Sequence, residues 1–117
     1  MNDSQYPWII LVPRREGLVE LYQLNDEDLK QCQSESIAVS KLLMTLFKGD
    51  KLNTGALGNM VPQLHLHHVV RYQSDAAWPR PVWGTVASIP YNSENLSNIT
   101  SMLCAEFSAT FADFSLA

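Results

Sequence analysis

Residues 63–70, Gln-Leu-His-Leu-His-His-Val-Val, alternate between polar and apolar side chains along most of their length. Successive side chains of a β-strand point to opposite faces, so this alternation predicts a strand with two different faces. One face carries Gln63, His65, His67 and Val69, and the other carries Leu64, Leu66, His68 and Val70. The first face is polar and the second is mainly apolar. Any fold for this chain therefore has to place two neighbouring histidines on one side of a sheet.

Two other segments are expected to pair with this strand or lie near it. Residues 8–12, Trp-Ile-Ile-Leu-Val, are a continuous apolar run that ends at a proline, which is typical of a strand covered on both faces and central in its sheet. Residues 52–56 are expected to form the first strand of a hairpin. Gly58 and Asn59 have turn chemistry and would connect it tightly to the second strand, at residues 64–72.

Two helices are expected. Asn25 is a suitable N-cap, and the acidic residues that follow it favour the positive end of a helix dipole. Apolar residues then recur at three- and four-residue steps, which predicts an amphipathic helix over residues 26–48 with Gly49 as its C-cap. A second helix is expected from residue 92 to about 107.

A loop rich in Trp and Pro lies between the histidine strand and the second helix. Residues 74–84, Ser-Asp-Ala-Ala-Trp-Pro-Arg-Pro-Val-Trp-Gly, are too stiff for a linker. Trp78 and Trp83 either close over an active site or hold a rigid surface plug by aromatic packing, and the sequence leaves both alternatives open. Residues 85–89 are expected to form a short edge strand.

The order of these elements is strand, helix, hairpin, loop and helix. It lacks the alternating βαβ pattern that would require a parallel sheet, so the expected class is α+β with an antiparallel sheet. The chain has 117 residues, which is enough for one core but too few for two. We therefore expect a single domain over residues 1–117.

Composition excludes several classes of function. No apolar run approaches the roughly 20 residues of a membrane span, and the start has no signal-peptide pattern, so a cytoplasmic protein is expected. The net charge is −4, and no stripe of Lys and Arg is present to follow a phosphate backbone, so long nucleic acids are not expected partners. Cys32 and Cys104 lack the CxxC spacing of zinc or redox sites, and both are expected to be buried free thiols.

Three uses compete for His65 and His67, whose side chains share one face. As metal ligands they need a third donor, and no nearby residue supplies one, so no metal site is predicted. As plain surface residues they would be solvated imidazoles on an open sheet. As a covalent catalyst, His65 would attack an electrophile through its neutral imidazole while His67 assists with charge or proton transfer.

The surrounding residues favour covalent catalysis. Residues 53–67, Asn-Thr-Gly-Ala-Leu-Gly-Asn-Met-Val-Pro-Gln-Leu-His-Leu-His, resemble the histidine-triad family, whose pattern is Asn-x-Gly, a loop with Gly-Gln-x-Val-x, and His-φ-His-φ-His-φ-φ, where φ is apolar. The matching positions are Asn53, Gly55, Gly58, Val61, His65 and His67. The Leu-Val-Pro-Arg-Arg segment at residues 11–15 resembles the family's strand that ends in Val-x-Pro-Lys/Arg. Trp78-Pro79 resembles a Trp-Pro that follows the triad in one family branch.

The resemblance covers residues 2–84 and implies a histidine-triad fold. That fold has an antiparallel sheet of about five strands with one main helix, and residues 85–117 form a C-terminal extension with a second helix. The family's usual N-terminal strand pair is not found in the sequence, and our hypothesis is that Met1 is an internal start. The resemblance also implies a homodimer formed through the main helix and the strand beside it. The Leu-Gly-Asn-Met-Val-Pro-Gln-Leu-His run is similar to that of some bacterial members, which indicates a distinct subgroup.

The resemblance also implies a reaction. Family members bind a small nucleotide and attack its α-phosphorus with the middle histidine, here His65, and water then resolves the nucleotidyl-imidazole. His67 is implied to contact phosphate or the leaving group, and Asn53 to hold a phosphate oxygen. The phosphate- and ribose-binding group is completed by backbone N–H groups at Gly58 and Asn59, and by Asn2 or Asp3. The implied activity is hydrolysis of a nucleoside phosphoramidate or dinucleoside polyphosphate without a cofactor.

Several positions depart from the family pattern. Gln63 replaces the first triad histidine and cannot carry a proton at neutral pH. Asn59 replaces the loop glutamine, Met60 a small hydroxyl residue, and Trp8 an additional histidine, while His68 stands where the family prefers an aliphatic residue. These changes spare His65, so lower or altered activity is expected. The alternative is a weak or inactive nucleotide-binding or regulatory module with the same fold.

Overall fold

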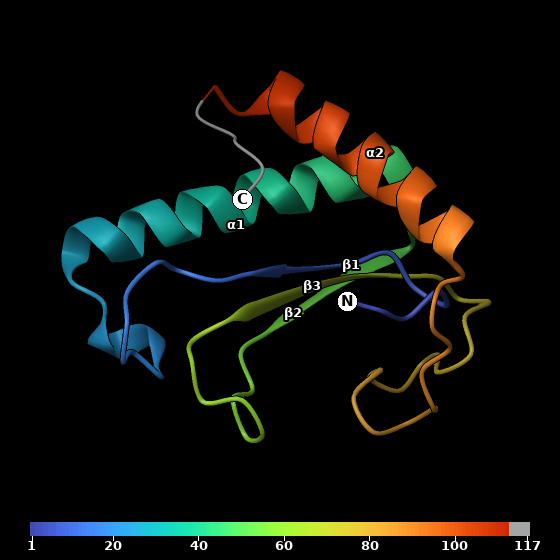
Figure 1. Ribbon diagram of the computed structural model, residues 1–117. Helices are drawn as coiled ribbons and strands as arrows, with labels where there is room; N and C mark the ends of the chain where they lie inside the picture. Colours follow the sequence, from blue (N-terminus) through green and yellow to red (C-terminus); the bar gives the residue numbers. More distant parts are fainter. Residues whose placement is uncertain (113–117) are drawn as a thin grey trace.

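The computed structural model describes residues 1–112, and its strands form one antiparallel sheet with two long helices on one side (Figure 1). The elements are β1 (Trp8–Leu11), the short 3₁₀ helix η1 (Leu21–Gln23), α1 (Asp26–Phe47), β2 (Lys51–Gly55), β3 (Leu66–Arg71) and α2 (Ser93–Thr110). The α+β class and the helices are as expected. No helix in this part of the chain is long and apolar enough to cross a bilayer.

The strand order is β1-β3-β2, so the histidine strand β3 lies in the centre of the sheet. Trp8 and Ile10 of β1 pair with Val69 and His67 of β3. On the other side, Asn53 and Gly55 of β2 pair with the same two residues. Paired residues of neighbouring strands point to the same face. His67 therefore lies in a row with Ile10 and Gly55, and Val69 lies in a row with Trp8 and Asn53.

The two faces of the sheet are covered by different parts of the chain. On one face Val70 packs against Val39 and Leu43 of α1, and α2 adds Leu103 and Phe107 to this cluster. On the other face, which bears His67, the core residues are Tyr6, Trp8, Val69, Ala77 and Val82. Figure 1 shows the helices above the sheet and the loop that contains Ala77 and Val82 below it. The loop after β3 thus takes the place of a second helical layer on the histidine face.

The start of α1 agrees with the sequence, but its end does not. Asn25 is the N-cap, and its side chain accepts a hydrogen bond from the Asp28 amide. The residue that ends α1 in the left-handed conformation is Lys48, with φ 49° and ψ 45°, and not Gly49. Gly49 is required for another reason, because a Cβ atom there would lie 2.3 Å from Cγ1 of Val70. The glycine allows the turn after α1 to pass close to the central strand.

Four expectations about the sheet are wrong. The sheet of residues 1–112 has three strands, not five, and β1 lies at its edge and not at its centre. Residues 85–89 do not form a strand, because their backbone makes isolated hydrogen bonds and no ladder with another strand. The carbonyl of Ile89 accepts from the Ser4 amide, and the carbonyl of Ala87 accepts from the Gln5 side chain. The hairpin of β2 and β3 exists, but its connection spans residues 56–65 and is not a tight turn.

The second helix begins where the sequence predicts and runs farther. The side chain of Asn92 caps it by accepting a hydrogen bond from the Asn95 amide, at 2.7 Å. The helix then continues past residue 107 to Thr110. Phe107 and Phe111 stack with ring centroids 5.6 Å apart, and both pack against the cluster under α1. This packing explains the additional turn at the C-terminus of α2.

A buried polar contact joins α1 to the sheet. The side chain of His68 is 0% exposed, and its Nε2 lies 2.7 Å from the hydroxyl oxygen of Ser36. Burial lowers the pKa of His68, against a smaller opposing effect of the backbone at Leu66. His68 is therefore neutral in the folded protein at neutral pH, which lets it occupy a position where an aliphatic residue was expected.

The lowered pKa of His68 makes folding sensitive to acid. Above about pH 6.5, its ordinary pKa, the side chain is neutral in both the folded and the unfolded states. Below that pH the unfolded chain binds a proton that the folded chain resists, so the free energy of unfolding falls until the lowered pKa is passed. We expect the double variant Ser36→Ala/His68→Leu to lose less stability between pH 7.5 and 5 than the wild type in urea unfolding. An equal loss in both proteins would contradict this assignment.

Candidate active site

His65 and His67 lie side by side on the face of the sheet that is turned away from the helices. Their ring centroids are 4.9 Å apart and the rings are inclined by 72°. His67 belongs to β3, while His65 immediately precedes that strand. His67 is nearly buried, at 7% exposure, and His65 is half-buried. The alternation of the sequence thus gives the expected pair, with one ring more accessible than the other.

A backbone carbonyl determines which nitrogen of His65 carries a proton. Nδ1 of His65 lies 2.7 Å from the carbonyl oxygen of Gln63. A carbonyl oxygen can only accept a hydrogen bond, so Nδ1 is the protonated nitrogen of the neutral ring. The lone pair is then on Nε2, the far nitrogen of the ring. Residue 63 contributes this contact through its backbone, and the replacement of a histidine by Gln63 leaves it intact.

The surroundings of His67 are mainly aromatic. The indole Nε1–H of Trp8 donates a hydrogen bond to Nδ1 of His67 over 2.9 Å. The rings of Trp8 and Trp83 pack edge-on against His67, with centroids 5.5 and 5.7 Å away. Burial lowers the pKa of His67, and the nearby positive charges of a protonated His65, the Met1 ammonium and a protonated His68 lower it further. His67 is therefore a neutral side chain at neutral pH.

Asn53 lies on the same face and is oriented by an arginine. Nη1 of Arg71 donates a hydrogen bond to Oδ1 of Asn53 over 2.7 Å. A guanidinium group has donors only, so Asn53 must turn its oxygen toward Arg71. Its NH₂ group then points away from Arg71 as a donor, and no described residue accepts from it. Asn53 thus presents an amide donor on the histidine face.

Arg71 itself is buried in a network in which each of its three side-chain nitrogens donates at least one hydrogen bond. It is 1% exposed and forms a two-pronged ion pair with Asp75, with N–O distances of 2.8 and 2.9 Å. Its guanidinium also donates to the Arg80 carbonyl and lies over the rings of Tyr6 and Trp78, 5.8 and 5.7 Å from their centroids. The network ties the loop after β3 to the sheet. The sequence pattern does not single out Arg71 as a site residue, although Arg71 continues the row of alternate residues that contains His67.

Asp75 is ionised in this network. Burial raises the pKa of its carboxyl group, but the hydrogen bonds from Arg71 and from the amides of Tyr72 and Trp78 outweigh burial and lower the pKa to about 2. The amide of Ala77 also donates to this carboxylate, at 3.1 Å. A single carboxylate thus holds both the arginine and the start of the Trp- and Pro-rich loop.

The tip of that loop covers part of the site. Trp83 lies over Gly55, where an added Cβ atom would be 3.4 Å from the indole ring. The same ring contacts His67, and its centroid is 6.2 Å from that of Trp8. Of the two alternatives for this loop, the structure shows aromatic packing directly beside the histidines. A role for Trp78 or Trp83 in closing over a ligand stays a prediction.

The other expected site residues lie in different surroundings. The side chain of Gln63 donates to the Arg15 carbonyl, away from His65. Gly58 adopts a left-handed conformation with φ 75°, and Asn59 follows it in an exposed loop. Asn2 accepts a hydrogen bond from the Tyr91 amide. Asp3 is 4% exposed, and one of its carboxylate oxygens, Oδ1, accepts from the Gln5 and Ile89 amides.

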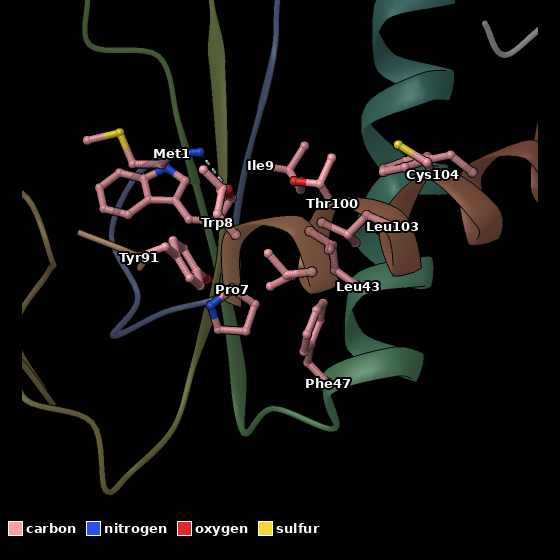
Figure 2. A pocket seen from close by; sticks show the side chains of 13 residues that line it. Met1, Pro7, Trp8, Ile9, Leu43, Phe47, Tyr91, Thr100, Leu103 and Cys104 are labelled. Atoms are coloured by element: carbon pink, nitrogen blue, oxygen red, sulfur yellow. Dashed lines mark hydrogen bonds between the residues drawn. The ribbon is translucent and has the colours of Figure 1, made fainter. Parts of the chain in front are cut away.

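The chain also contains a cavity away from the histidines. A mainly apolar pocket of about 280 Å³ lies between α2, the end of α1 and the start of β1 (Figure 2). Pro7, Leu43, Tyr91 and Cys104 are among its lining residues, and neither His65 nor His67 is. Within residues 1–112, no three His, Cys, Asp or Glu side chains are grouped as metal ligands. The cysteines are free, Cys32 buried and Cys104 only half-buried.

Comparisons with known proteins agree on one family. The model of the HIT domain family matches residues 1–74. A histidine triad protein from Marinobacter aquaeolei VT8 is 50% identical, with a TM-score of 0.89 over 94% of this chain and 80% of that chain. A histidine triad protein from Bradyrhizobium japonicum is 43% identical, with a TM-score of 0.86 over 91% and 79% of the two chains.

A third solved structure is that of a histidine triad protein from Sinorhizobium meliloti 1021. It is 35% identical to this chain, and the alignment covers 95% of this chain and 79% of that chain with a TM-score of 0.85. No curated protein matches the sequence.

The Arg71–Asp75 pair should be far more important for stability than the exposed pair Arg15–Asp28. Replacing Asp75 with alanine leaves a buried guanidinium unpaired, so Asp75→Ala is expected to lower the free energy of unfolding by about 3–5 kcal/mol. The matched control Asp28→Ala breaks a pair whose arginine is 55% exposed, and it should cost about 1 kcal/mol or less. Urea unfolding of the two variants measures both values, and equal losses would contradict the assigned role of Arg71.

Proposed function

Because the chain belongs to the histidine-triad family, we propose that it is a nucleotide hydrolase in which His65 attacks the α-phosphorus of a nucleoside phosphate. Members of this family are nucleotide-binding hydrolases and transferases. The proposed substrates are nucleoside phosphoramidates and dinucleoside polyphosphates. The replacement of the first triad histidine by Gln63 is proposed to mark a bacterial subgroup of the family.

The observation that carries this proposal is the hydrogen bond between His65 and the Gln63 carbonyl. It keeps the proton on Nδ1 and leaves the lone pair on Nε2, as a nucleophile requires. When Nε2 attacks phosphorus, positive charge develops on the imidazole ring. The carbonyl oxygen that accepts from Nδ1–H stabilises that charge. Because a backbone atom supplies this contact, the nucleophile does not depend on the identity of the side chain at position 63.

The proposed reaction has two displacements at phosphorus. In the first, His65 Nε2 forms a P–N bond while the bond from phosphorus to the leaving group breaks, and the leaving group departs with the electron pair. In the second, water attacks the same phosphorus and loses a proton to solvent, the electron pair of the P–N bond returns to Nε2, and a nucleoside monophosphate is released with neutral His65 restored. His67 contacts the leaving group or the phosphoryl oxygens, and no cofactor takes part.

Asn53 is proposed to bind a phosphoryl oxygen. Arg71 holds its amide oxygen, so the NH₂ group is available to the ligand. Backbone N–H groups near Gly58 and Asn59 are proposed as further donors, because Gly58 turns the loop sharply at this point. Asn2 and Asp3 are proposed to lie near the ribose, and the hydrogen bonds of Asp3 to the Gln5 and Ile89 amides would then position its carboxylate.

A second candidate is a nucleotide-binding module with little or no catalysis. It is favoured by the side chain of Gln63, which cannot carry a proton and is bound to the Arg15 carbonyl. Met60 is 95% exposed in the loop where the family pattern has a hydroxyl residue, so that donor is also absent from the described site. Such a module would bind nucleotide and form no adduct.

We also propose a cytoplasmic homodimer formed through α1 and β2. The outer edge of β2 pairs with no other strand of residues 1–112, so β2 of a second copy can extend the sheet there. Light scattering of the purified protein should give twice the mass of the chain.

Loss of the His65 nucleophile should abolish hydrolysis and spare binding. We expect His65→Ala to lower the hydrolysis of adenosine 5′-phosphoramidate with a fluorescent leaving group, and of a diadenosine polyphosphate, by about 10³-fold or more, because the covalent route is lost. The matched control is Gln63→Ala, which keeps the backbone carbonyl and should keep most of the activity. If His65→Ala hydrolysed these substrates as fast as the wild type, the assignment of His65 as the nucleophile would be wrong. AMP binding without hydrolysis by the wild type would favour the binding module.

Asn53→Asp is expected to weaken nucleotide binding without changing the stability of the fold. Aspartate has nearly the same shape and still accepts from Arg71, so the thermal unfolding curve should stay near that of the wild type. The donor to phosphate is replaced by a negatively charged oxygen, and AMP affinity should fall at least about tenfold, or about 1.4 kcal/mol. Calorimetric titration measures the affinity, and unchanged binding would remove Asn53 from the phosphate site.

A further inference from the structure

Trp8 stands where the family pattern has an additional histidine, and it contacts the second histidine of the site directly. Its side chain is 9% exposed, and its indole Nε1–H donates to Nδ1 of His67 over 2.9 Å. An indole N–H is a donor only, whereas a histidine at this position could accept, donate or carry a proton. The replacement therefore changes what His67 can do.

The hydrogen bond from Trp8 determines the protonation state of His67. Because Trp8 can only donate, Nδ1 of His67 must offer its lone pair, and the neutral ring then carries its proton on Nε2. A proton on Nδ1, as in an imidazolium, would face the indole proton and break this bond. We propose that Trp8 is a positioning residue that holds His67 as a neutral hydrogen-bond donor at Nε2.

The position of Trp8 is itself well determined. It pairs with Val69 in the sheet, and its ring packs edge-on against Tyr6 and Trp83, with centroids 6.4 and 6.2 Å away. Its carbonyl accepts a hydrogen bond from the Met1 amino group, visible in Figure 2. A ring fixed on several sides cannot easily turn to let His67 change its tautomer.

Among residues 1–112, the groups that surround His67 all disfavour its charged form or leave it unaffected. Trp8 and Ile10 face it from β1, Gly55 from β2 and Trp83 from the loop, and none of these side chains titrates near neutral pH. Burial lowers the pKa of His67, and so do the titratable groups that act on it, which are His65, the Met1 ammonium and His68. All of them disfavour a positive charge on His67.

The two histidines are therefore fixed in opposite tautomers. His65 has its proton on Nδ1 and a lone pair on Nε2, while His67 has its lone pair on Nδ1 and a proton on Nε2. In the proposed reaction, which this inference assumes, His65 supplies the electron pair and His67 donates a hydrogen bond to the phosphoryl or leaving-group oxygen. A neutral imidazole cannot give that proton away completely, because an imidazolide anion would remain.

This arrangement favours a particular class of substrate. An alkylamine leaving group must gain a proton as its bond to phosphorus breaks, and a neutral His67 does not provide one. A nucleotide or another phosphate leaves as a stable anion and needs only a hydrogen bond. Among the proposed substrates, the site should therefore prefer dinucleoside polyphosphates, and other leaving groups of low basicity, over phosphoramidates of alkylamines.

Nitrogen NMR of the protein labelled with ¹⁵N in histidine tests the tautomer without any activity. In the wild type near pH 7.5, His67 should show a pyridine-like signal for Nδ1 and a pyrrole-like signal for Nε2, and His65 the reverse. In Trp8→Phe, which keeps an aromatic ring but removes the N–H donor, His67 should titrate at a higher pH because its neutral form has lost a hydrogen bond. A wild-type His67 protonated on Nδ1 would overturn the proposal, even if Trp8→Phe does not fold.

Kinetics test the consequence for substrates. The wild type should hydrolyse a diadenosine polyphosphate at least about tenfold faster, in kcat/KM, than an adenosine 5′-phosphoramidate of an alkylamine. Trp8→His, which restores a group able to exchange protons, should reduce this ratio and shift the pH profile of kcat/KM for the amine substrate. An unchanged ratio in Trp8→His would contradict the positioning role. Absence of hydrolysis of both substrates would reject the proposed function while the NMR result still decides the tautomer.

Discussion

The buried guanidinium of Arg71 is the group on which the histidine face depends. It comes from the central strand, and its donors reach Asp75 and Arg80 in the following loop and Asn53 on β2. A charge at this depth is tolerated only when it is paired with an opposite charge and hydrogen-bonded, and the loop folds back on the sheet to supply most of the accepting oxygens. The packing of the core, the position of the loop and the orientation of Asn53, which is proposed to bind phosphate, thus all depend on Arg71.

The sequence predicted those parts of the fold that depend on local chemistry. Asn25 and Asn92 cap their helices as their side chains suggest, and the alternation around His67 gives the correct faces of β3. The wrong expectations concern long-range pairing. The continuous apolar run that begins at Trp8 could form either an edge strand or a central strand. Nothing in the local sequence of residues 85–89 indicates that their backbone forms a hydrogen bond with Ser4.

The candidate site shows the same division. The nearness of His65 and His67 follows from their spacing on a strand, so it could be predicted. The proton positions could not, because they depend on a carbonyl at Gln63 and on an indole that comes from another strand. Trp8 counted as a lost histidine in the sequence, but in the structure it is a donor to the ring beside it. A departure from a family pattern can therefore install a different function at the same position.

The hydrogen bond between Ser36 and His68 has a consequence for the alignment of the two layers. Apolar side chains of α1 could pack on the sheet in several registers with similar energies. A slide of the helix along the sheet would separate the Ser36 hydroxyl from the buried His68 ring and leave that ring without its partner, at a cost of about 1–3 kcal/mol. The hydrogen bond thus favours one register of α1 on the sheet over the others. Because His67 directly precedes His68 on the same strand, this hydrogen bond also fixes where the helix layer lies relative to the face that bears His67.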